Sequence, residues 1–390
     1  MTQPQNPQQT KARDEPLHVL IAGGGVAGLE AAFGLRALAA GSVHVTLLAA
    51  DDHYVYRPWS VGEPFTSSHA GRFSLAKLAT QAGADLIRDT LTEVDPVGRQ
   101  ARTASGTEIG YDALLVGVGA QPHAVFEHAT NVDDSRMEEL LHGLVQDVEG
   151  GFVRRLAIVV PAPIPWPLPA YELALMASER AWDMQADMDI TLLTPERGPL
   201  DMFGATVSRE FSQLLADRRI EVVTSAYCEI PRSQLVIVHP CGRSVAAERI
   251  IALPQLRGPE LTGLPSDGGG FIPVDEHGRV RGVEGVWAAG DVTDYPIKQG
   301  GVAAQLAVTA ATSIAAQAGI GLEARPFSPV LEGVLMTGGT QRYLRYQPAS
   351  DQGPEESAFS EIPRGSHPSK IATRYLEPQL SGAQIPAVKP

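Results

Sequence analysis

Three glycines near the amino terminus have a spacing that could bind phosphate. Gly23, Gly25 and Gly28 form a G-x-G-x-x-G pattern that follows an apolar run and opens an alanine-rich segment. The first glycine allows a tight turn, the second lets the backbone approach a pyrophosphate, and the third allows close helix–strand packing. Free N–H groups at the helix start then face the phosphates. The pattern predicts a dinucleotide site formed by Gly23, Gly25, Val26, Ala27 and Gly28.

The acidic partner of such a turn is displaced in this sequence. A carboxylate about 20 residues further on usually accepts hydrogen bonds from the adenosine ribose. Here Ala49 and Ala50 stand at the end of the next apolar run, and the acids follow at Asp51 and Asp52. Either Asp51 reaches back to the ribose, or both acids are solvated turn residues, and the sequence leaves both readings open.

A second turn between an expected strand and an expected helix is built from proline. Prolines stand at every second position from Pro161 to Pro169. Proline has no N–H and restricts the residue before it to extended backbone. This turn therefore cannot surround a pyrophosphate with backbone donors.

The elements that position the two turns repeat along the chain. Residues 17–52 predict a strand, a helix and a second strand, and residues 154–195 predict the same order again. A strand, a loop and a long helix are expected at 285–319. We assign this last group to the first domain, so the second domain is an insertion. The expected fold class is α/β, with two Rossmann-like doubly wound domains.

The expected boundaries follow from these patterns. They are a disordered polar arm at 1–16, a first nucleotide-binding domain at 17–125 and 270–320, a degenerate second domain at 126–269, and a small carboxy-terminal α+β segment and tail at 321–390. Within the last segment, residues 325–347 predict two short strands around a Gly-Gly turn. Residues 350–370 predict an irregular tail.

Composition excludes several classes of function. The chain has 390 residues and a formal net charge of -14, which argues against binding to a nucleic-acid backbone. We expect a cytoplasmic protein, because no apolar run approaches the roughly 20 residues of a membrane span and no signal peptide is evident. The two cysteines, Cys228 and Cys241, are too few for a disulfide framework or a cysteine-rich metal site. No metal is expected.

Three motifs, in order, resemble those of FAD oxidoreductases with two dinucleotide-binding domains. The segment "GVWAAGDV" is similar to the second flavin motif of that superfamily, and "YDALLVGVGAQP" is similar to its middle motif. The resemblance implies that Asp291 receives hydrogen bonds from the ribityl chain and that Gly290 allows close approach. It also implies that Gly119 lies near the nucleotide and that FAD is the cofactor.

Two further segments narrow the resemblance. "YVYRPWSVG", which contains Arg57, and "YPIKQGGVAAQLA" look like the branch of sulfide:quinone oxidoreductases, flavocytochrome c sulfide dehydrogenases and type II NADH dehydrogenases. The resemblance implies that the helix starting near Gly300 and Gly301 points its amino terminus at the flavin. Lys298 would then add positive charge near the flavin, unless it is a solvated surface lysine.

The proline turn stands where this superfamily receives electrons. NADH-using members carry a second glycine-rich motif there, so the prolines indicate a degenerate NAD(P)-type site. Sulfide-oxidising members have a cysteine a few residues before P-A-Y-E, which is retained here as residues 169–172. Trp166 takes the place of that cysteine, and a second catalytic cysteine near residues 331–339 is absent. Sulfide oxidation through thiols is therefore excluded.

The retained Glu172 is a candidate catalytic acid, with Lys298 as a second candidate. In the resembling folds, the helix that Glu172 opens runs beside the flavin, where a carboxylate can relay protons. The alternative, which we weigh equally, is a first-turn glutamate favoured by the helix dipole. Four aromatic residues could line a pocket over the flavin ring, although we favour a role in the core: Tyr54, Tyr56, Trp59 and Trp166.

The sequence thus predicts an FAD-dependent oxidoreductase with a noncovalent flavin and no cysteine chemistry. Its donor and acceptor stay open, with a quinone, a small organic molecule or a protein as options. One alternative is a flavin-binding scaffold or partner subunit without turnover, and another is an NAD(P)H-dependent reductase with an unusual nucleotide pose. We expect no nucleic-acid partner and no firm membrane attachment. A homodimer is one option that the sequence leaves open.

Overall fold

A five-stranded parallel sheet forms the first α/β unit. The strands stand in the order β20-β9-β1-β2-β5. They are β1 (Leu17–Ala22), β2 (Val43–Leu48), β5 (Ala84–Ile87), β9 (Ala113–Val116) and β20 (Val286–Ala288). Counted along the chain, this is the 3-2-1-4-5 order of a doubly wound fold, which places a crevice beside β1 where the order reverses. The computed structural model describes residues 15–349, 354–363 and 370–380, so most of the expected arm lies outside it.

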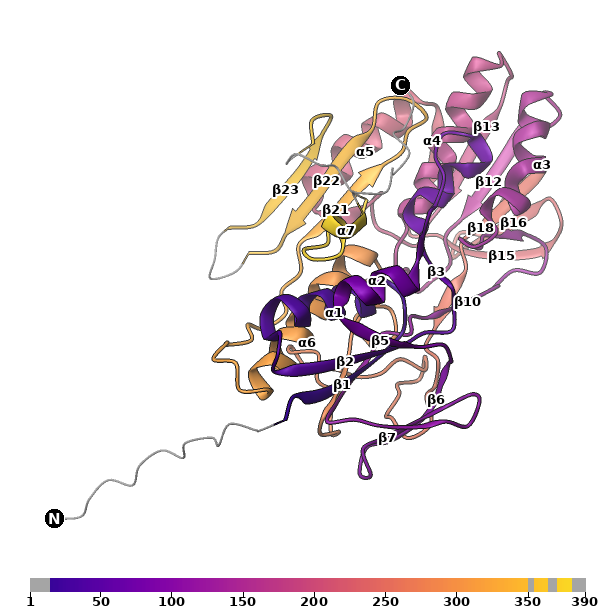
Figure 1. Cartoon of the computed structure of the whole chain (residues 1–390). Coiled ribbons are helices and arrows are strands. Elements are labelled where there is room, and N and C mark those ends of the chain that lie inside the picture. Colours follow the sequence, from indigo (N-terminus) through magenta and orange to yellow (C-terminus); the bar gives the residue numbers. More distant parts are fainter. Residues whose placement is uncertain (1–14, 350–353, 364–369, 381–390) are drawn as a thin grey trace.

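Helices rich in small residues cover this sheet. They are α1 (Val26–Ala39), α2 (Leu75–Ala82) and α6 (Gly300–Gln317), and α1 packs directly against α6 (Figure 1). A methyl group at Gly34 would lie 3.6 Å from the Cβ of Ala311, which shows how closely the two helices approach. Alanine and glycine therefore bring the amino termini of both helices to the same end of the sheet.

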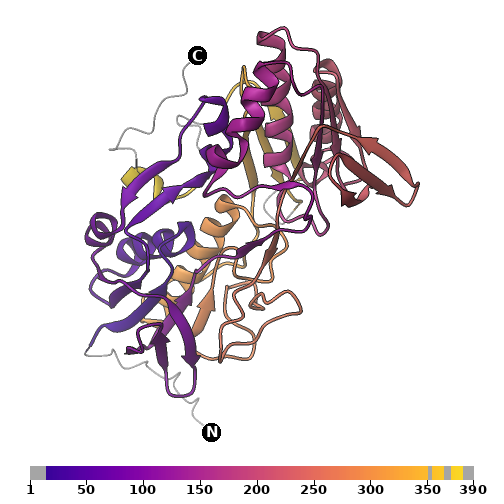
Figure 2. The same ribbon diagram turned by 90° about the vertical axis from the view of Figure 1, so that its right-hand side faces the viewer.

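A second parallel sheet follows the same plan. Its order is β11-β18-β12-β13-β14. The strands are β11 (Thr130–Asn131), β12 (Arg155–Val159), β13 (Asp189–Leu193), β14 (Ile220–Val223) and β18 (Arg249–Ala252), with helices α3 (Met137–Glu149), α4 (Leu168–Asp183) and α5 (Ala205–Asp217). In Figure 2 the first unit lies below and this second unit above. The predicted pair of doubly wound α/β domains is confirmed.

The chain crosses between the two units on a two-stranded link. This link is formed by β10 (Gln121–His123) and β19 (Gln255–Arg257), which pair antiparallel. After β19 the backbone packs on the first unit at once, because Val94 N–H donates to the Thr262 carbonyl at 2.9 Å. The first unit thus resumes near residue 258, before the boundary expected after residue 269.

Smaller elements complete the two units. They are β3 (His53–Tyr56) with β4 (Gly71–Ser74), β6 (Leu91–Asp95) with β7 (Gln100–Thr103) and β8 (Glu108–Gly110), and β15 (Tyr227–Arg232) with β16 (Leu235–His239) and β17 (Arg243–Ala246), together with the 3-10 helices η1 (Arg57–Phe65) and η2 (Asp201–Phe203). No helix within the described ranges is both long enough and apolar enough to span a membrane.

The carboxy-terminal segment forms an antiparallel sheet. β21 (Leu331–Leu335) and β22 (Arg342–Gln347) pair around Gly338 and Gly339, as the sequence predicts. A third strand, β23 (Glu356–Ser360), pairs with β22. The expectation of an irregular tail at 350–370 is therefore wrong for this stretch, because β22 offers a free edge to which β23 adds. Residues 350–353 and 364–369 lie outside the described residues.

A last short helix, α7 (Glu377–Leu380), lies beside α1 (Figure 1). Leu376 and Leu380 are buried, so this end of the described chain is packed against the first unit.

Candidate functional site

A cavity of about 1080 Å³ opens where the carboxyl ends of both parallel sheets meet. The glycine turn after β1 and residues 117–120 after β9 line it from the first unit. Val160 and Pro161 after β12, and Leu253 and Pro254 after β18, line it from the second unit. Ligands of doubly wound folds bind at this edge of the sheet. The two units therefore share one site.

The glycine turn has the geometry of a pyrophosphate cradle. Gly23 has a φ of +119°, and a methyl group there would lie 2.3 Å from the Gly117 carbonyl oxygen. Gly25 faces open space, with no atom within 4 Å of the position of a methyl group. No described side chain caps the start of α1. The first N–H groups of α1, beginning at Val26 and Ala27, thus stand at the cavity wall.

The third glycine of the motif has a packing role. A methyl group at Gly28 would lie 1.9 Å from the carbonyl oxygen of Gly23, and Gly28 does not line the cavity. The sequence motif thus divides into residues that face the ligand and one residue that lets the helix approach the turn.

Asp291 presents its carboxylate to the cavity. It follows β20, and no described residue donates a hydrogen bond to its side chain. Burial raises the pKa of Asp291 to about 6, and the nearby Lys298 ammonium opposes that rise. Gly290 has a φ of +83° and would meet Ala27 and Ala303 at 3.2 and 3.3 Å if it carried a methyl group. This partly buried acceptor fits the hydroxyls of a ribityl chain.

The amino terminus of α6 reaches the same cavity. Gln299 and Gly300 line it, and the Gln299 side-chain oxygen accepts from Val302 N–H at 2.8 Å. Gly301 is buried and does not line the cavity, and a methyl group there would lie 3.0 Å from the Gln299 side-chain oxygen. The partial positive charge of this helix end therefore points at the space that the resemblance assigns to the flavin.

Lys298 lines the cavity but directs its ammonium into the first unit. The group donates a hydrogen bond to the Thr293 carbonyl and lies 3.8 Å from the centroid of the Phe271 ring. Burial lowers the pKa of Lys298 to about 8, and Asp291 opposes that fall. Lys298 can thus adjust the charge near Asp291, and its role in catalysis stays a prediction.

The remaining predicted cofactor residues also lie at the cavity. Gly119, Asp51 and Arg57 line it. Asp51 is exposed and makes no hydrogen bond with a described residue, so both readings of its role stay open. The neighbouring Asp52 forms an ion pair with Arg88.

Glu172 lies at the opposite wall, where it is 1% exposed. Its carboxylate accepts from the Met336 N–H at 2.9 Å and pairs with the Lys370 ammonium at 2.6 Å. Lys370 also donates to the Pro58 carbonyl at 2.9 Å. Both side chains line the cavity. A helix of the second unit, the end of β21 and the carboxy-terminal segment thus combine to place one buried ion pair.

Burial acts on the two members of this pair in opposite directions. Desolvation raises the pKa of Glu172, and it lowers the pKa of Lys370, while their mutual attraction opposes both shifts. The ionised pair is therefore favoured over the neutral pair by less free energy than it would be in water. Such a pair can hold a proton and can pass it to a ligand.

The sequence reasoning missed Lys370. Lys370 stands in a polar stretch with no spacing pattern, and its partner Glu172 lies far away along the chain. The only available signal was the lysine itself in an otherwise proline-rich tail. Asp134 was missed as well. Asp134 lines the cavity and is exposed to solvent there.

The four aromatic candidates divide into two groups. Tyr54 and Trp166 line the cavity, whereas Tyr56 and Trp59 belong to the core without lining it. Trp166 also packs edge-on against Phe203, with 5.8 Å between the ring centroids.

The proline turn closes over the second unit's side of the cavity. Pro161, Pro165 and Pro169 line it, and the Pro165 carbonyl accepts from the backbone N–H of Lys298 at 3.1 Å. Gln255 donates its side-chain amide to the Ala162 carbonyl. The turn is therefore attached to the first unit through its own backbone.

A carboxylate that follows β13 is turned inward. Glu196 is 5% exposed and accepts from Tyr171 Oη at 2.6 Å, from Thr194 Oγ1 at 2.8 Å and from Leu200 N–H at 3.0 Å. An acid near the end of this strand would bind the ribose of a nucleotide in a functional doubly wound domain. Here the carboxylate oxygens of Glu196 instead accept hydrogen bonds from other residues of the protein.

The cysteines lie away from the site. Cys228 is on β15 and Cys241 is in the turn between β16 and β17, and neither lines the cavity. Burial raises the pKa of the Cys228 thiol to about 12, which makes it a poor nucleophile.

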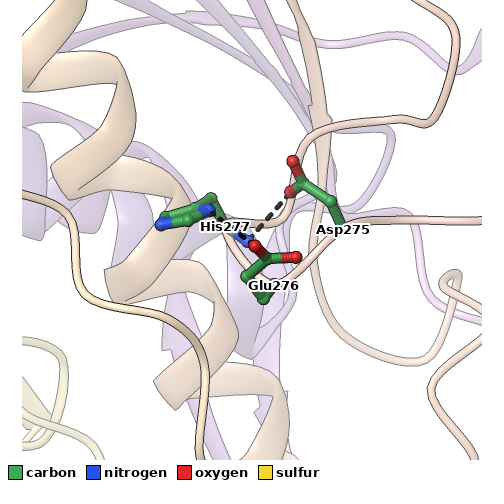
Figure 3. Close-up of side chains that lie close together, drawn as sticks. All are labelled: Asp275, Glu276 and His277. Carbon is green, nitrogen blue, oxygen red and sulfur yellow. Dashed lines mark hydrogen bonds and ion pairs between the residues drawn. The ribbon is translucent and has the colours of Figure 1, made fainter.

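A cluster of Asp275, Glu276 and His277 has groups within reach of one ion, but its contacts are those of a turn (Figure 3). Asp275 accepts from the backbone N–H groups of His277 and Arg279, and His277 Nε2 contacts the Ala324 carbonyl. We assign no metal to it.

Comparison with known families gives a match that fits this geometry. The model of the pyridine nucleotide-disulphide oxidoreductase family matches residues 3–144 and 169–313. The chain belongs to this family. Members are FAD-dependent oxidoreductases, so FAD is the cofactor that the glycine turn, Asp291 and the α6 terminus fit. The unmatched interval, residues 145–168, contains most of the proline turn.

Individual relatives are distant. The oxidoreductase ptaL of Pestalotiopsis fici is 24% identical over 306 residues, covering 72% of this chain and 78% of that protein. A sulfide-quinone reductase of Aquifex aeolicus is 24% identical over 272 residues, which span 64% of this chain and 61% of that protein. The solved sulfide:quinone oxidoreductase of Aquifex aeolicus superposes with a TM-score of 0.80 at 19% identity, covering 88% of this chain and 87% of that one.

The glycine turn makes contrasting predictions for two substitutions. Gly25→Val places its side chain in the cavity, so we expect loss of FAD with little change in the unfolding midpoint of the FAD-free protein. Gly28→Ala forces atoms together inside the fold, so we expect a loss of about 1–3 kcal/mol in the free energy of unfolding. Flavin absorbance per protein and urea unfolding measure the two effects. Equal loss of stability in both variants would contradict the division of roles.

Asp291 predicts how FAD binding depends on pH. Because burial raises the pKa of Asp291 to about 6, the carboxyl is largely ionised at pH 7 and largely protonated at pH 5. The ionised form accepts hydroxyl hydrogen bonds better, so affinity should fall roughly tenfold from pH 7 to pH 5. Equilibrium dialysis with FAD measures it. Asp291→Asn should bind more weakly and show a flat profile, and an unchanged slope in this variant contradicts the assignment.

The Glu172–Lys370 pair predicts strong coupling between two substitutions. Glu172→Gln or Lys370→Met alone leaves a buried group unpaired, so each should cost about 3–5 kcal/mol of unfolding free energy. The double variant leaves no unpaired charge and should recover more than half of the summed cost. Urea unfolding of the four proteins completes the cycle. Additive losses would show that the two groups do not interact.

Proposed function

We propose that the chain is an FAD-dependent oxidoreductase that exchanges electrons with a small apolar carbonyl or quinone compound bound beside Glu172 and Lys370. The observation that carries the proposal is their buried ion pair at 2.6 Å, placed in the wall of the cavity that contains the flavin motifs. Buried charges of this kind are costly, and they cluster at functional sites.

The substrate side of the cavity supports an apolar ligand. Its lining includes Val160, Trp166, Leu168, Leu253 and Leu256. Apolar surface with a few convergent polar groups is the usual form of a small-molecule site. The lining also carries polar residues, Asp134 and Gln299 among them, and we expect a ligand oxygen to be directed at the buried Glu172–Lys370 pair.

Conversion of a quinone to a quinol takes two electrons and two protons. FAD, when bound in this cavity, supplies two-electron redox chemistry. Lys370 can donate one proton to a ligand oxygen, and Glu172 stabilises its charge before transfer. The second proton can enter from solvent, since the cavity is open. In the opposite direction the same pair accepts a proton from a ligand hydroxyl.

Nicotinamide nucleotides are poor candidates for the donor. Five of the nine residues at 161–169 have no backbone N–H, the Pro165 carbonyl accepts a hydrogen bond from the first unit, and Glu196 is turned inward. The alternative is a flavin-binding scaffold without turnover, which would also need no site for an electron donor. We favour an enzyme, because the Glu172–Lys370 pair places polar groups at the cavity wall.

Anaerobic mixing tests this proposal. NADH and NADPH should bleach the flavin slowly and without saturation, because neither can be held in the usual pose. A short-chain benzoquinone should reoxidise dithionite-reduced protein with saturation. Glu172→Gln should slow that step by about 10²-fold, because it removes the carboxylate that keeps the proton donor Lys370 charged.

Glu138→Gln, an exposed change in α3, is the matched control and should leave the rate unchanged. Rapid, saturable bleaching of the flavin by either nucleotide would contradict the hypothesis that the nicotinamide site is degenerate. No reaction with quinones or other small carbonyl compounds would leave the scaffold as the better account.

A further inference from the structure

The last described residues, 370–380, pack along the first unit. We name these residues the strap. Its first two residues, Lys370 and Ile371, line the cavity. Ile371 packs closely on the start of α6. A methyl group at Gly300 would lie only 2.5 Å from Ile371 Cδ1. The backbone N–H of Ile371 donates to Tyr56 Oη at 3.0 Å. The strap thus forms part of the cavity wall.

A buried carboxylate on α1 holds the other part of the strap. Glu30 is 0% exposed. It accepts from the backbone N–H groups of Arg374 at 2.7 Å, of Tyr375 at 3.0 Å and of Leu376 at 2.7 Å. The Tyr375 ring also rests on Gly34, where a methyl group would lie 3.4 Å away.

An apolar side chain at position 30 could not accept these three hydrogen bonds. Three converging N–H groups need an acceptor with several lone pairs, and a carboxylate supplies them without any donor of its own. Burying a carboxylate is costly unless it is fully hydrogen bonded. Burial of the Glu30 carboxylate therefore depends on the strap, and among the described residues Glu30 is the acceptor for the backbone N–H groups at 374–376.

The position of Glu30 connects the strap to the cofactor site. Glu30 lies in the helix that begins at the glycine turn, so one rigid element carries both the pyrophosphate cradle and the attachment point of the strap. The strap runs from there to α6 and to Glu172. Its release would open the cavity wall and would remove Lys370 from its partner.

We propose that residues 370–380 are a strap that closes the cofactor cavity, and that Glu30 is a positioning residue that fastens it. The consequence for Lys370 rests on the proposed function. Closure around FAD does not, so the test below uses no turnover.

Tryptic cleavage of the full-length holoprotein under native conditions measures opening of the strap. The bond after Lys370 is buried and can be cut only when the strap lifts. Glu30→Gln keeps the size but presents an amide donor to the N–H groups, so cleavage after Lys370 should rise at least about tenfold. FAD should also dissociate faster during dialysis, followed by flavin absorbance. Glu138→Gln should behave like the wild type.

Arg342 is an internal control, because it lies on β22, the middle strand of the third sheet, and the bond after it is exposed only when that sheet unfolds. Cleavage after Lys370 without cleavage after Arg342, together with faster loss of FAD, supports the proposal. Unchanged cleavage after Lys370 overturns the role of Glu30. Faster cleavage with unchanged FAD retention overturns closure of the cavity.

If Glu30→Gln does not fold, Tyr56→Phe carries the same test. It removes the acceptor of the Ile371 N–H and should raise cleavage after Lys370 at least about threefold. Cleavage equal to that of the wild type would overturn the strap.

Discussion

The buried pair of Glu172 and Lys370 imposes the strictest constraint on this molecule. Neither charge can be left alone inside the protein, so the segments that carry them must meet with hydrogen-bonding geometry. Glu172 comes from the inserted unit and Lys370 from the carboxy-terminal segment, while Met336 of the third sheet supplies a further donor. One interaction therefore fixes three parts of the chain around a common cavity.

The cavity itself follows from the order of strands in the two parallel sheets. The strand order reverses beside β1 in the first sheet and beside β12 in the second, and residues that follow these strands line the same cavity. In the first unit the glycine turn and Asp291 line the cavity. In the second unit three prolines line it, and Glu196 is buried beneath hydrogen bonds from other residues. The proposal of a degenerate nicotinamide site rests on these differences and on the gap in the family match at residues 145–168.

Sequence patterns predict the parts of this site whose requirements are local. Gly23 and Gly290 need positive φ angles, and a short motif records that need. The two doubly wound units follow from repeated strand and helix patterns. Lys370 and Glu30 were not foreseen, because their partners lie far away in the chain and no periodicity marks them. The β23 strand was missed for a related reason, since its pairing with β22 depends on a tertiary edge rather than on its own short, polar sequence.

A crystal structure of the holoprotein grown with both NADH and a short-chain benzoquinone tests the central claim most directly. The account predicts FAD in the glycine cradle, with a quinone oxygen within hydrogen-bonding distance of Lys370 or Glu172 and no nucleotide at the proline turn. A nicotinamide ring stacked on the flavin, with its pyrophosphate at residues 161–169, would contradict it.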